Sequence, residues 1–332
     1  MKALFIGGTG IISSACSQVA VERGIELTLF NRGQTGKRPV PAGARLIHGD
    51  IRDLDATRRA LAGQEFDVVV DFVAFTPEQV QHDIELFRGR TGQYIFISSA
   101  SAYQKPPLGL PITESTVLRN PVWAYSQAKI AGEDLLLHAY REDGFPATIV
   151  RPSHTYDRAY LPLEGGYTVI DRLRRGKKVV IHGDGTSLWV LTHHLDLARA
   201  FVGLLGNPHA IGESYHITSD ELLTWNQIYE TLAAAAGVEP GWVHVPSECI
   251  AAYDADWGDG LLGDKAHSVI FDNTKIKRAV PGWAAGIPFA QGAREIIAWH
   301  EADPARQVMD ARFDALLDRI IAASEAAWPQ RG

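Results

Sequence analysis

Short apolar runs alternate with helix-length segments along the first half of the chain. The runs are rich in β-branched and aromatic residues and end near Gly, Asn or Asp, which is typical of buried strands. They cover residues 3–6, 26–30, 45–48, 67–72, 93–97 and 147–151. The stretches between them that are long enough for helices cover residues 13–23, 54–62, 77–87 and 124–140.

This alternation predicts the fold class. Parallel strands joined by right-handed crossovers carry helices on both faces of the sheet, so we expect an α/β protein with a doubly wound, parallel-sheet Rossmann domain over residues 1–160. Beyond residue 160 the elements become shorter and aromatic residues frequent. Residues 161–332 are therefore predicted to form mainly a smaller C-terminal substrate-binding lobe, with residues 195–220 packing back on the first domain.

The first predicted strand runs into a glycine-rich turn, Gly7-Gly8-Thr9-Gly10, and a helix follows it. Glycine lets the backbone turn sharply and approach a pyrophosphate at the helix N-terminus, where free N–H groups favour anions. Ser13 stands where a third glycine is usual. The motif predicts a site for NAD or NADP, and a tight structural turn is the alternative. The expected contacts are Gly7, Thr9, Gly10, Ile11 and Ile12.

The second predicted strand ends at Asn31-Arg32, about twenty residues further on, where an acidic residue normally binds the adenosine ribose. Asn31 can bond a hydroxyl but lacks the carboxylate that repels a 2′-phosphate. Arg32 suits that phosphate or the adenine face, unless it is a solvated loop residue. NAD and NADP therefore both stay open. Further cofactor contacts are expected at Asp50, Ile51, Phe72, Val73, Ala74 and Pro152.

Candidate catalytic residues follow the fifth strand and open the next helix. Tyr125 and Lys129 lie four residues apart, so on a helix their Cβ atoms are about 5–6 Å apart. An ammonium about 4 Å from the phenol supplies about 4 kcal/mol at an effective dielectric of about 20, which lowers the pKa by about three units. We therefore expect Tyr125 to act as general base and Ser99 to bond the substrate oxygen. An exposed helix pair is the alternative reading.

These residues and their companions carry a family resemblance. The companions are Gly49-Asp50, Glu114, Arg151-Pro152, Gly183-Asp184-Gly185 and Asp272-Asn273-Thr274-Lys275. Together the motifs resemble the extended short-chain dehydrogenase/reductase superfamily, and within it the NAD-dependent sugar epimerase/dehydratase family, from residue 1 to about residue 285. The resemblance implies that Ser99, Tyr125 and Lys129 are catalytic and that Lys129 also holds the nicotinamide ribose. It further implies a tightly held NAD or NADP that is regenerated within each turnover.

The chain departs from the family on the substrate side. Ala100-Ser101 replaces the Asp-Glu pair of relatives that dehydrate a hexose nucleotide. His154 and Trp189 stand where many relatives use Asn and Arg for a nucleotide sugar. Trp cannot neutralise a diphosphate but can stack on a sugar, and His can orient a hydroxyl, exchange a proton near neutral pH, or be structural. The residues expected at the substrate are Ser99, Ser101, Tyr125, His154, Trp189 and His193.

The motifs predict a function within three alternatives. The leading one is an NAD(P)-dependent enzyme that transiently oxidises a hydroxyl carbon of a sugar, polyol or nucleoside, so that epimerisation or dehydration can follow before reduction. A net reductase or dehydrogenase is the second. The third is a dinucleotide-regulated RNA-binding or sensor protein, because the strand end 29–33 is similar to that of chloroplast stem-loop binding proteins.

Composition narrows the class of protein. With 332 residues, 46% of them apolar and only two Cys, the chain is too long and too apolar for a disordered or disulfide-stapled protein. The net charge of 32 − 39 = −7 makes nucleic acid an improbable partner. No stretch approaches the roughly 18 apolar residues of a membrane span, so we expect a cytoplasmic protein with a small-molecule substrate and no membrane contact.

Two further expectations concern metals and assembly. His193 and His194 have no third and fourth ligand at a suitable spacing, so no metal site is predicted. The family often forms dimers through helices beside the active-site strand, which makes a homodimer possible. The compatible small and apolar positions are Ala128, Ala131, Gly132, Leu135 and Leu136.

Overall fold

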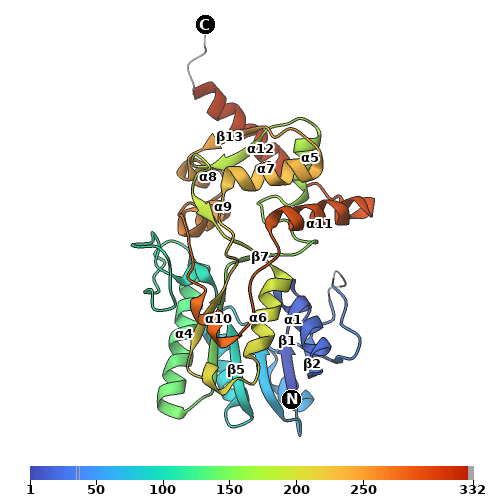
Figure 1. The fold of residues 1–332 in the computed structure, drawn as a ribbon, viewed down its shortest axis with the longest axis vertical. Helices are drawn as coiled ribbons and strands as arrows, with labels where there is room; N and C mark the ends of the chain where they lie inside the picture. Colours follow the sequence, from blue (N-terminus) through green and yellow to red (C-terminus); the bar gives the residue numbers. More distant parts are fainter. Residues whose placement is uncertain (35, 37, 328–332) are drawn as a thin grey trace.

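The computed structural model describes residues 1–34, 36 and 38–327. Its lower part in Figure 1 holds a parallel sheet of seven strands in the order β11-β6-β5-β4-β1-β2-β3. All six strands predicted from the sequence are present in it, and the doubly wound α/β fold is confirmed. The strands are β1 (Lys2–Ile6), β2 (Glu26–Asn31), β3 (Arg45–His48), β4 (Phe66–Asp71), β5 (Thr91–Ile97), β6 (Ala147–Pro152) and β11 (Ser214–Ile217).

Helices cover both faces of the sheet because successive side chains of a strand point to opposite faces. Ala3 and Phe5 of β1 pack under one helical layer, whereas Leu4 and Ile6 pack under the other. The first layer holds α1 (Ile11–Glu22) and α6 (His194–Leu204). The second holds α2 (Leu54–Ala60), α3 (Pro77–Phe87) and α4 (Ala124–Asp143).

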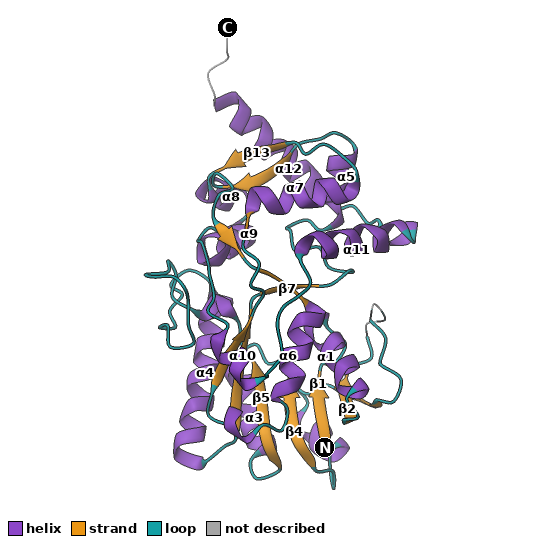
Figure 2. Ribbon diagram, in the orientation of Figure 1, coloured by secondary structure: helices purple, strands orange, loops and turns teal. Residues whose placement is uncertain are grey.

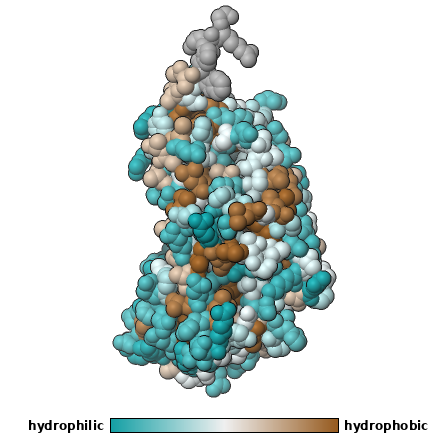
Figure 3. Space-filling view, turned by 90° about the vertical axis from the view of Figure 1, so that its left-hand side faces the viewer, coloured by the Kyte–Doolittle hydropathy of each residue, from teal (hydrophilic) through white to brown (hydrophobic). Residues whose placement is uncertain are grey.

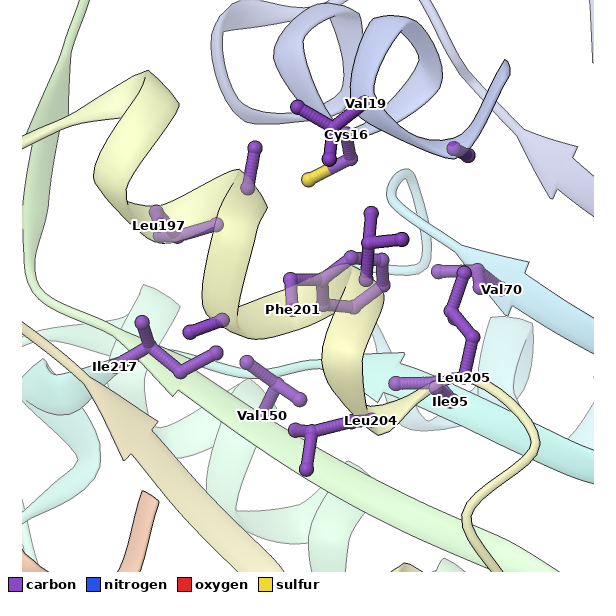
Figure 4. Packing of buried hydrophobic residues seen from close by; sticks show 14 of the residues in the cluster. Cys16, Val19, Val70, Ile95, Val150, Leu197, Phe201, Leu204, Leu205 and Ile217 are labelled. Atoms are coloured by element: carbon purple, nitrogen blue, oxygen red, sulfur yellow. The ribbon is translucent and has the colours of Figure 1, made fainter. Parts of the chain in front are cut away.

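The core of the first layer joins distant parts of the chain. Helix α6 lies beside α1, and Figure 4 shows Phe201 of α6 below Cys16 and Val19 of α1, next to Val70 of β4. Strand β11 pairs with β6 along the sheet edge, and α10 (Thr274–Ala279) packs near it. This arrangement completes the sheet with residues that follow the candidate catalytic motifs in sequence.

The upper part of the molecule is built from shorter elements, as Figure 2 shows. Two cores hold it together, one beneath α7 and α11 and one beneath α12. Its helices are α5 (Tyr167–Arg174), α7 (Trp225–Ala236), α8 (Ser247–Tyr253), α9 (Ala255–Gly260), α11 (Phe289–Glu301) and α12 (Ala311–Ala327). The two-stranded pairs are β7 (His154–Tyr156) with β10 (Leu191–His193), β9 (Leu188–Trp189) with β12 (Leu223–Thr224), and β8 (Val179–His182) with β13 (Trp242–Val245).

Two surface features bear on partners. Figure 3 shows apolar patches at mid-height on one side of the molecule, among hydrophilic side chains. On α4, Gly132 and Leu136 are buried, and a side chain at Gly132 would meet Val80 and Phe96 of the same chain. Those two positions of the predicted dimer face therefore pack inside the protomer. Within the described residues, no helix is both long and apolar enough to cross a membrane.

Candidate active site

A cavity of about 230 Å³ opens at the carboxyl ends of β1 and β2. Eight of the residues predicted to bind the cofactor line it: Gly7, Thr9, Gly10, Asn31, Arg32, Asp50, Ile51 and Val73. Arg52 and Phe75 also line it and were not predicted. The ring of Phe72 instead packs 5.3 Å from that of Phe5, in the core beneath the cavity.

The loop between β1 and α1 is closed by a side chain rather than by a third glycine. Ser13 Oγ donates to the carbonyl of Gly7 (2.6 Å) and accepts from the N–H of Gly10 (2.7 Å). Gly7 has a φ of +81°, and a Cβ there would lie 2.5 Å from Val73 Cγ1. The loop thus places Gly7, Thr9 and Gly10 on the cavity wall directly before α1 begins, a position that fits the pyrophosphate of NAD.

Replacing Gly7 by Ala tests that position. The left-handed φ costs an alanine about 1–2 kcal/mol, and the contact with Val73 adds to it. Displacement of the loop removes at least one charge-assisted hydrogen bond of about 1.5–3 kcal/mol, so NAD affinity should fall about tenfold or more in calorimetry.

Gly24→Ala is the matched control, because Gly24 has a φ of +74° with no atom within 4 Å of its ideal Cβ. This variant should lose only the stability that the left-handed φ costs an alanine, and it should bind NAD with the affinity of the native protein. Equal NAD affinity in the Gly7 and Gly24 variants would contradict the assignment of the loop.

A second cavity, of about 310 Å³, lies between the carboxyl edge of the sheet and the upper part of the molecule. Five of the six residues expected at the substrate line it: Ser99, Ser101, Tyr125, His154 and Trp189. Ile11, Ile12 and Pro152, which were predicted to touch the cofactor, lie on its wall as well. The lining residues that the sequence did not single out include Trp123, Tyr160, Asp264, Lys265, Val269 and Phe271.

Three hydroxyl groups are connected beside the candidate catalytic tyrosine. Ser99 Oγ lies 2.8 Å from Ser101 Oγ, which accepts a hydrogen bond from Ser126 Oγ (2.7 Å). Tyr125 is half-buried at the first turn of α4, with its ring 5.0 Å from that of Trp123. Ser99, at the end of β5, favours the phenolate by hydrogen bonding and lowers the pKa of Tyr125, but burial outweighs it and the net pKa is raised.

Lys129 lies one turn further along α4 and is buried. Its Nζ donates to the carbonyls of Ala74 (2.7 Å) and Ile97 (2.8 Å) and lies 5.8 Å from the centre of the Tyr125 ring. Burial lowers the pKa of Lys129 to about 8. The prediction that Lys129 lowers the pKa of Tyr125 is therefore wrong for this structure, because the ammonium is directed at two carbonyls rather than at the phenol.

The buried ammonium of Lys129 makes the free energy of unfolding depend on pH. The pKa of Lys129 falls from 10.5 to about 8 on folding, so the unfolded chain binds more protons between these values and this group makes stability rise with pH there. Urea unfolding near pH 8 and near pH 10 should show the native protein gaining stability relative to Lys129→Met. Parallel pH dependence of the two proteins would contradict this.

The two substitutions on the substrate side form a pair. Trp189 Nε1 donates to His154 Nδ1 (3.2 Å), which leaves the proton on Nε2 and directs a donor away from Trp189. Burial, with the charge of Lys265, lowers the pKa of His154 to about 3. His154 is thus neutral near pH 7, which disfavours proton exchange among the roles considered for it and leaves the orienting and structural roles. It is suited to donating a hydrogen bond to a hydroxyl.

The structure does not bring His193 to the cavity. Its Nε2 lies 3.0 Å from Glu295 Oε2, and its Nδ1 accepts from the N–H of Leu195 at the start of α6. This residue caps a helix instead of lining the substrate cavity, contrary to the expectation from its position in sequence. Across residues 1–34, 36 and 38–327, no group of three or more His, Cys, Asp or Glu side chains is arranged to hold a metal ion.

Comparison with known proteins decides the family. The model of the NAD dependent epimerase/dehydratase family matches residues 3–218. The chain belongs to this family. It is accordingly an NAD-dependent enzyme of the extended short-chain dehydrogenase/reductase type.

Relatives of this epimerase/dehydratase family member carry different functions. The chloroplast stem-loop binding protein of 41 kDa b from Arabidopsis thaliana is 30% identical over 305 residues, which cover 88% of this chain and 77% of that one. UDP-glucose 4-epimerase from Corynebacterium glutamicum is 27% identical over 278 residues, 71% of this chain and 81% of that one. The matches to the UDP-glucose 4-epimerases of Lactobacillus helveticus and Streptomyces lividans span only 51% and 50% of those proteins.

Solved structures share the fold of this family member. UDP-glucose 4-epimerase from Bifidobacterium longum, in complex with NAD+ and UDP, has a TM-score of 0.74 at 18% identity, covering 92% of this chain and 99% of that one. A dTDP-glucose 4,6-dehydratase from Streptomyces venezuelae has a TM-score of 0.74 at 22% identity, with coverages of 92% and 98%. Both likenesses concern the fold alone.

Proposed function

We propose that this NAD-dependent enzyme transiently oxidises a hydroxyl carbon of a sugar, polyol or nucleoside and then allows epimerisation or dehydration at the neighbouring carbon. The observation that carries the proposal is the meeting of Ser99 and Tyr125 in one cavity whose wall includes Ile11 and Ile12, the first residues of α1 directly after the glycine loop. A substrate there lies between the proton-transfer groups and the proposed site for NAD.

The cofactor has a defined place in this proposal. The loop of Gly7 and Gly10 would hold the pyrophosphate, and Asn31 and Arg32 would contact the adenosine. The chemistry that a bound nicotinamide supplies is reversible hydride transfer. Asn31 Oδ1 accepts from the N–H of Gly33 (3.0 Å), so its amide is left as a donor, and no carboxylate at this position repels a 2′-phosphate. NADP is therefore compatible alongside NAD.

Proton transfer falls to Tyr125. Ser99, oriented by its hydrogen bond with Ser101, bonds the substrate oxygen, and Tyr125 Oη takes the hydroxyl proton as the carbon is oxidised and returns it on reduction. Taking that proton requires the phenolate form of Tyr125; because burial raises its pKa, less of the phenolate is present near neutral pH, and turnover should rise with pH. Lys129 is buried, donates to two carbonyls and is not among the residues that line either cavity, so its role in holding the nicotinamide ribose rests on the family resemblance.

The transient ketone acidifies the adjacent C–H bond, which makes a change of configuration or loss of water possible before reduction. Ala100 and Ser101 lack the carboxyl groups that serve hexose dehydration in relatives, so that reaction with its usual acid and base is not favoured. His154 Nε2 supplies a neutral donor for a further hydroxyl. Trp189 stands where many relatives have an arginine that binds the diphosphate of a nucleotide sugar. Tryptophan carries no positive charge, so a nucleotide sugar is not the expected substrate.

A substrate screen tests the proposal. Mass spectrometry should first find NAD or NADP in the purified protein. Candidate sugars, polyols and nucleosides are then added, with the reduced-nicotinamide absorbance and the product mass followed together. We expect an isomer, or a product lighter by one water, without net change in absorbance. Stoichiometric oxidation or reduction of the cofactor would favour the net dehydrogenase or reductase instead.

RNA binding is the second candidate, because a relative at 30% identity is named for stem-loop binding. The net charge of −7 opposes it, since duplex and stem-loop RNA are polyanions. Salt-dependent RNA binding, together with full biological function of Tyr125→Phe, would support this candidate over the enzymatic one.

A further inference from the structure

A short π-helical turn, Leu261–Lys265, brings two charged residues from the upper part of the molecule into the substrate cavity. Side chains from separate elements hold its backbone. Asn120 Nδ2 donates to the carbonyl of Gly263 (2.7 Å), while His182 Nε2 (3.0 Å) and Trp225 Nε1 (3.1 Å) both contact the carbonyl of Lys265. π-helical turns are frequent at functional sites, and this one is fixed where it meets the cavity.

The two charges of the turn differ in their partners. Asp264 is neutralised by Lys105, whose Nζ lies 2.7 Å from Asp264 Oδ1 and whose side chain is 1% exposed. Lys265 has no carboxylate within 4 Å of its Nζ in the part of the chain that the structure describes, and the Nζ lies 5.3 Å from the centre of the Trp123 ring. Its ammonium is thus a positive charge on the cavity wall without a directly paired carboxylate.

The other titratable groups near Lys265 do not remove this charge. Burial lowers the pKa of His154 to about 3 and of His182 to about 4, with a contribution from Lys265, so both rings are neutral near pH 7. Glu164 is a carboxyl group on which Lys265 acts through space, with its pKa raised mainly by burial, but it forms no ion pair with Lys265 within 4 Å. Five aromatic side chains line the cavity, namely Trp123, Tyr125, Tyr160, Trp189 and Phe271, and they weaken the screening of the ammonium by water.

We infer that Lys265 binds a compact anionic group of the substrate, a carboxylate or a monophosphate. This inference rests on the proposed function and narrows the substrate to an acidic sugar or polyol, or to its phosphate ester. Lysine acts as a point charge toward such groups, and a charge-assisted hydrogen bond of this kind corresponds to about 10- to 100-fold in affinity. Lys265 lines the same cavity as Ser99 and Tyr125, so a molecule whose anionic group binds Lys265 can offer a hydroxyl to these two residues.

The test uses the whole protein in the presence of NAD and compares charged ligands with neutral parents. Glucose, glucose 6-phosphate, glucuronate and UDP-glucose are titrated calorimetrically into the native protein, Lys265→Met and Lys265→Arg. Lys178→Met is the matched control, since Lys178 is an exposed residue that pairs with Glu325 far along the chain. Circular dichroism of each variant checks that it is folded.

We expect glucose 6-phosphate or glucuronate to bind the native protein and Lys178→Met at least about tenfold more tightly than glucose does. Lys265→Met should lose that advantage, and Lys265→Arg should keep part of it. Tighter binding of glucose 6-phosphate would indicate a phosphate site, and tighter binding of glucuronate would indicate a carboxylate site. The inference is overturned if neither anion exceeds glucose by this margin, if Lys265→Met keeps the margin, or if UDP-glucose binds most tightly and depends on Lys265.

Failure of the proposed function has a separate signature. If glucose or another neutral sugar is turned over without net redox change while no anion is preferred, the proposed function holds and only the role of Lys265 falls. If an anion binds at Lys265 but no ligand is turned over, or a ligand is turned over equally fast by Tyr125→Phe, the anion site holds and the proposed function falls.

Discussion

Tyr125→Phe is expected to lower turnover by about 10²- to 10⁴-fold, the range over which a positioned acid or base contributes. The ring contact with Trp123 at 5.0 Å remains in the variant, whereas the proton carrier next to Ser99 is removed. Cofactor affinity and the free energy of unfolding should stay close to native values, because phenylalanine fills the same space. The measurement is the initial rate with a substrate found in the screen, beside calorimetric NAD binding.

Tyr140→Phe is the matched control for that experiment. Tyr140 lies on the same helix α4, is 38% exposed, and lies away from both cavities. Its loss of a hydroxyl should leave turnover unchanged. A rate for Tyr125→Phe within about threefold of the control would remove Tyr125 from the chemistry, since even weak acid or base catalysis contributes more.

Glu133→Gln is expected to cost about 3–5 kcal/mol in the free energy of unfolding, the range for breaking a buried ion pair. Glu133 is fully buried on α4, where it accepts from Arg151 Nε (2.9 Å) and from Ser98 at the end of β5. The substitution leaves the guanidinium of Arg151 buried without its counter-charge. Since Lys129 is one turn away on α4, the site should loosen as the helix does.

Asp143→Asn provides the comparison for this stability effect. Asp143 ends α4 and pairs with Arg88 at 2.7 Å, but the two side chains are 42% and 48% exposed. Exposed pairs contribute about 0–1 kcal/mol, so urea unfolding should barely change. Equal losses in the two variants would show that the buried pair is not what joins α4 to the sheet.

The sequence predicts the cofactor side of the molecule well for a local reason. Strands such as Lys2–Ile6 are short apolar runs, and the turn after the first of them needs glycine, so both features are visible in a few adjacent residues. Ser99 and Tyr125 are similarly visible because one closes a strand and the other opens a helix. The role of Ser13 in closing the loop needed the structure, because it depends on side-chain direction.

The residues of the substrate cavity are harder to predict because contacts between segments that are far apart in the sequence determine their positions. Lys265 lies in an irregular stretch whose path is set by Asn120, His182 and Trp225, residues far away in sequence, so no local pattern marks it. The direction of the Tyr125 pKa shift was wrong for a related reason. Helical spacing brings Lys129 near the phenol, but its Nζ donates hydrogen bonds to the carbonyls of Ala74 and Ile97, which follow or end two strands of the sheet.

The central claim is that oxidation is transient and that the substrate's own hydrogen returns to it. The most direct measurement uses a substrate found in the screen, deuterated at the reacting carbon, with the native enzyme and no added cofactor. The account predicts many turnovers per enzyme, a product that keeps the deuterium, and no accumulation of reduced nicotinamide. Loss of the deuterium from the product, with reduced cofactor formed in equal amount, would contradict it.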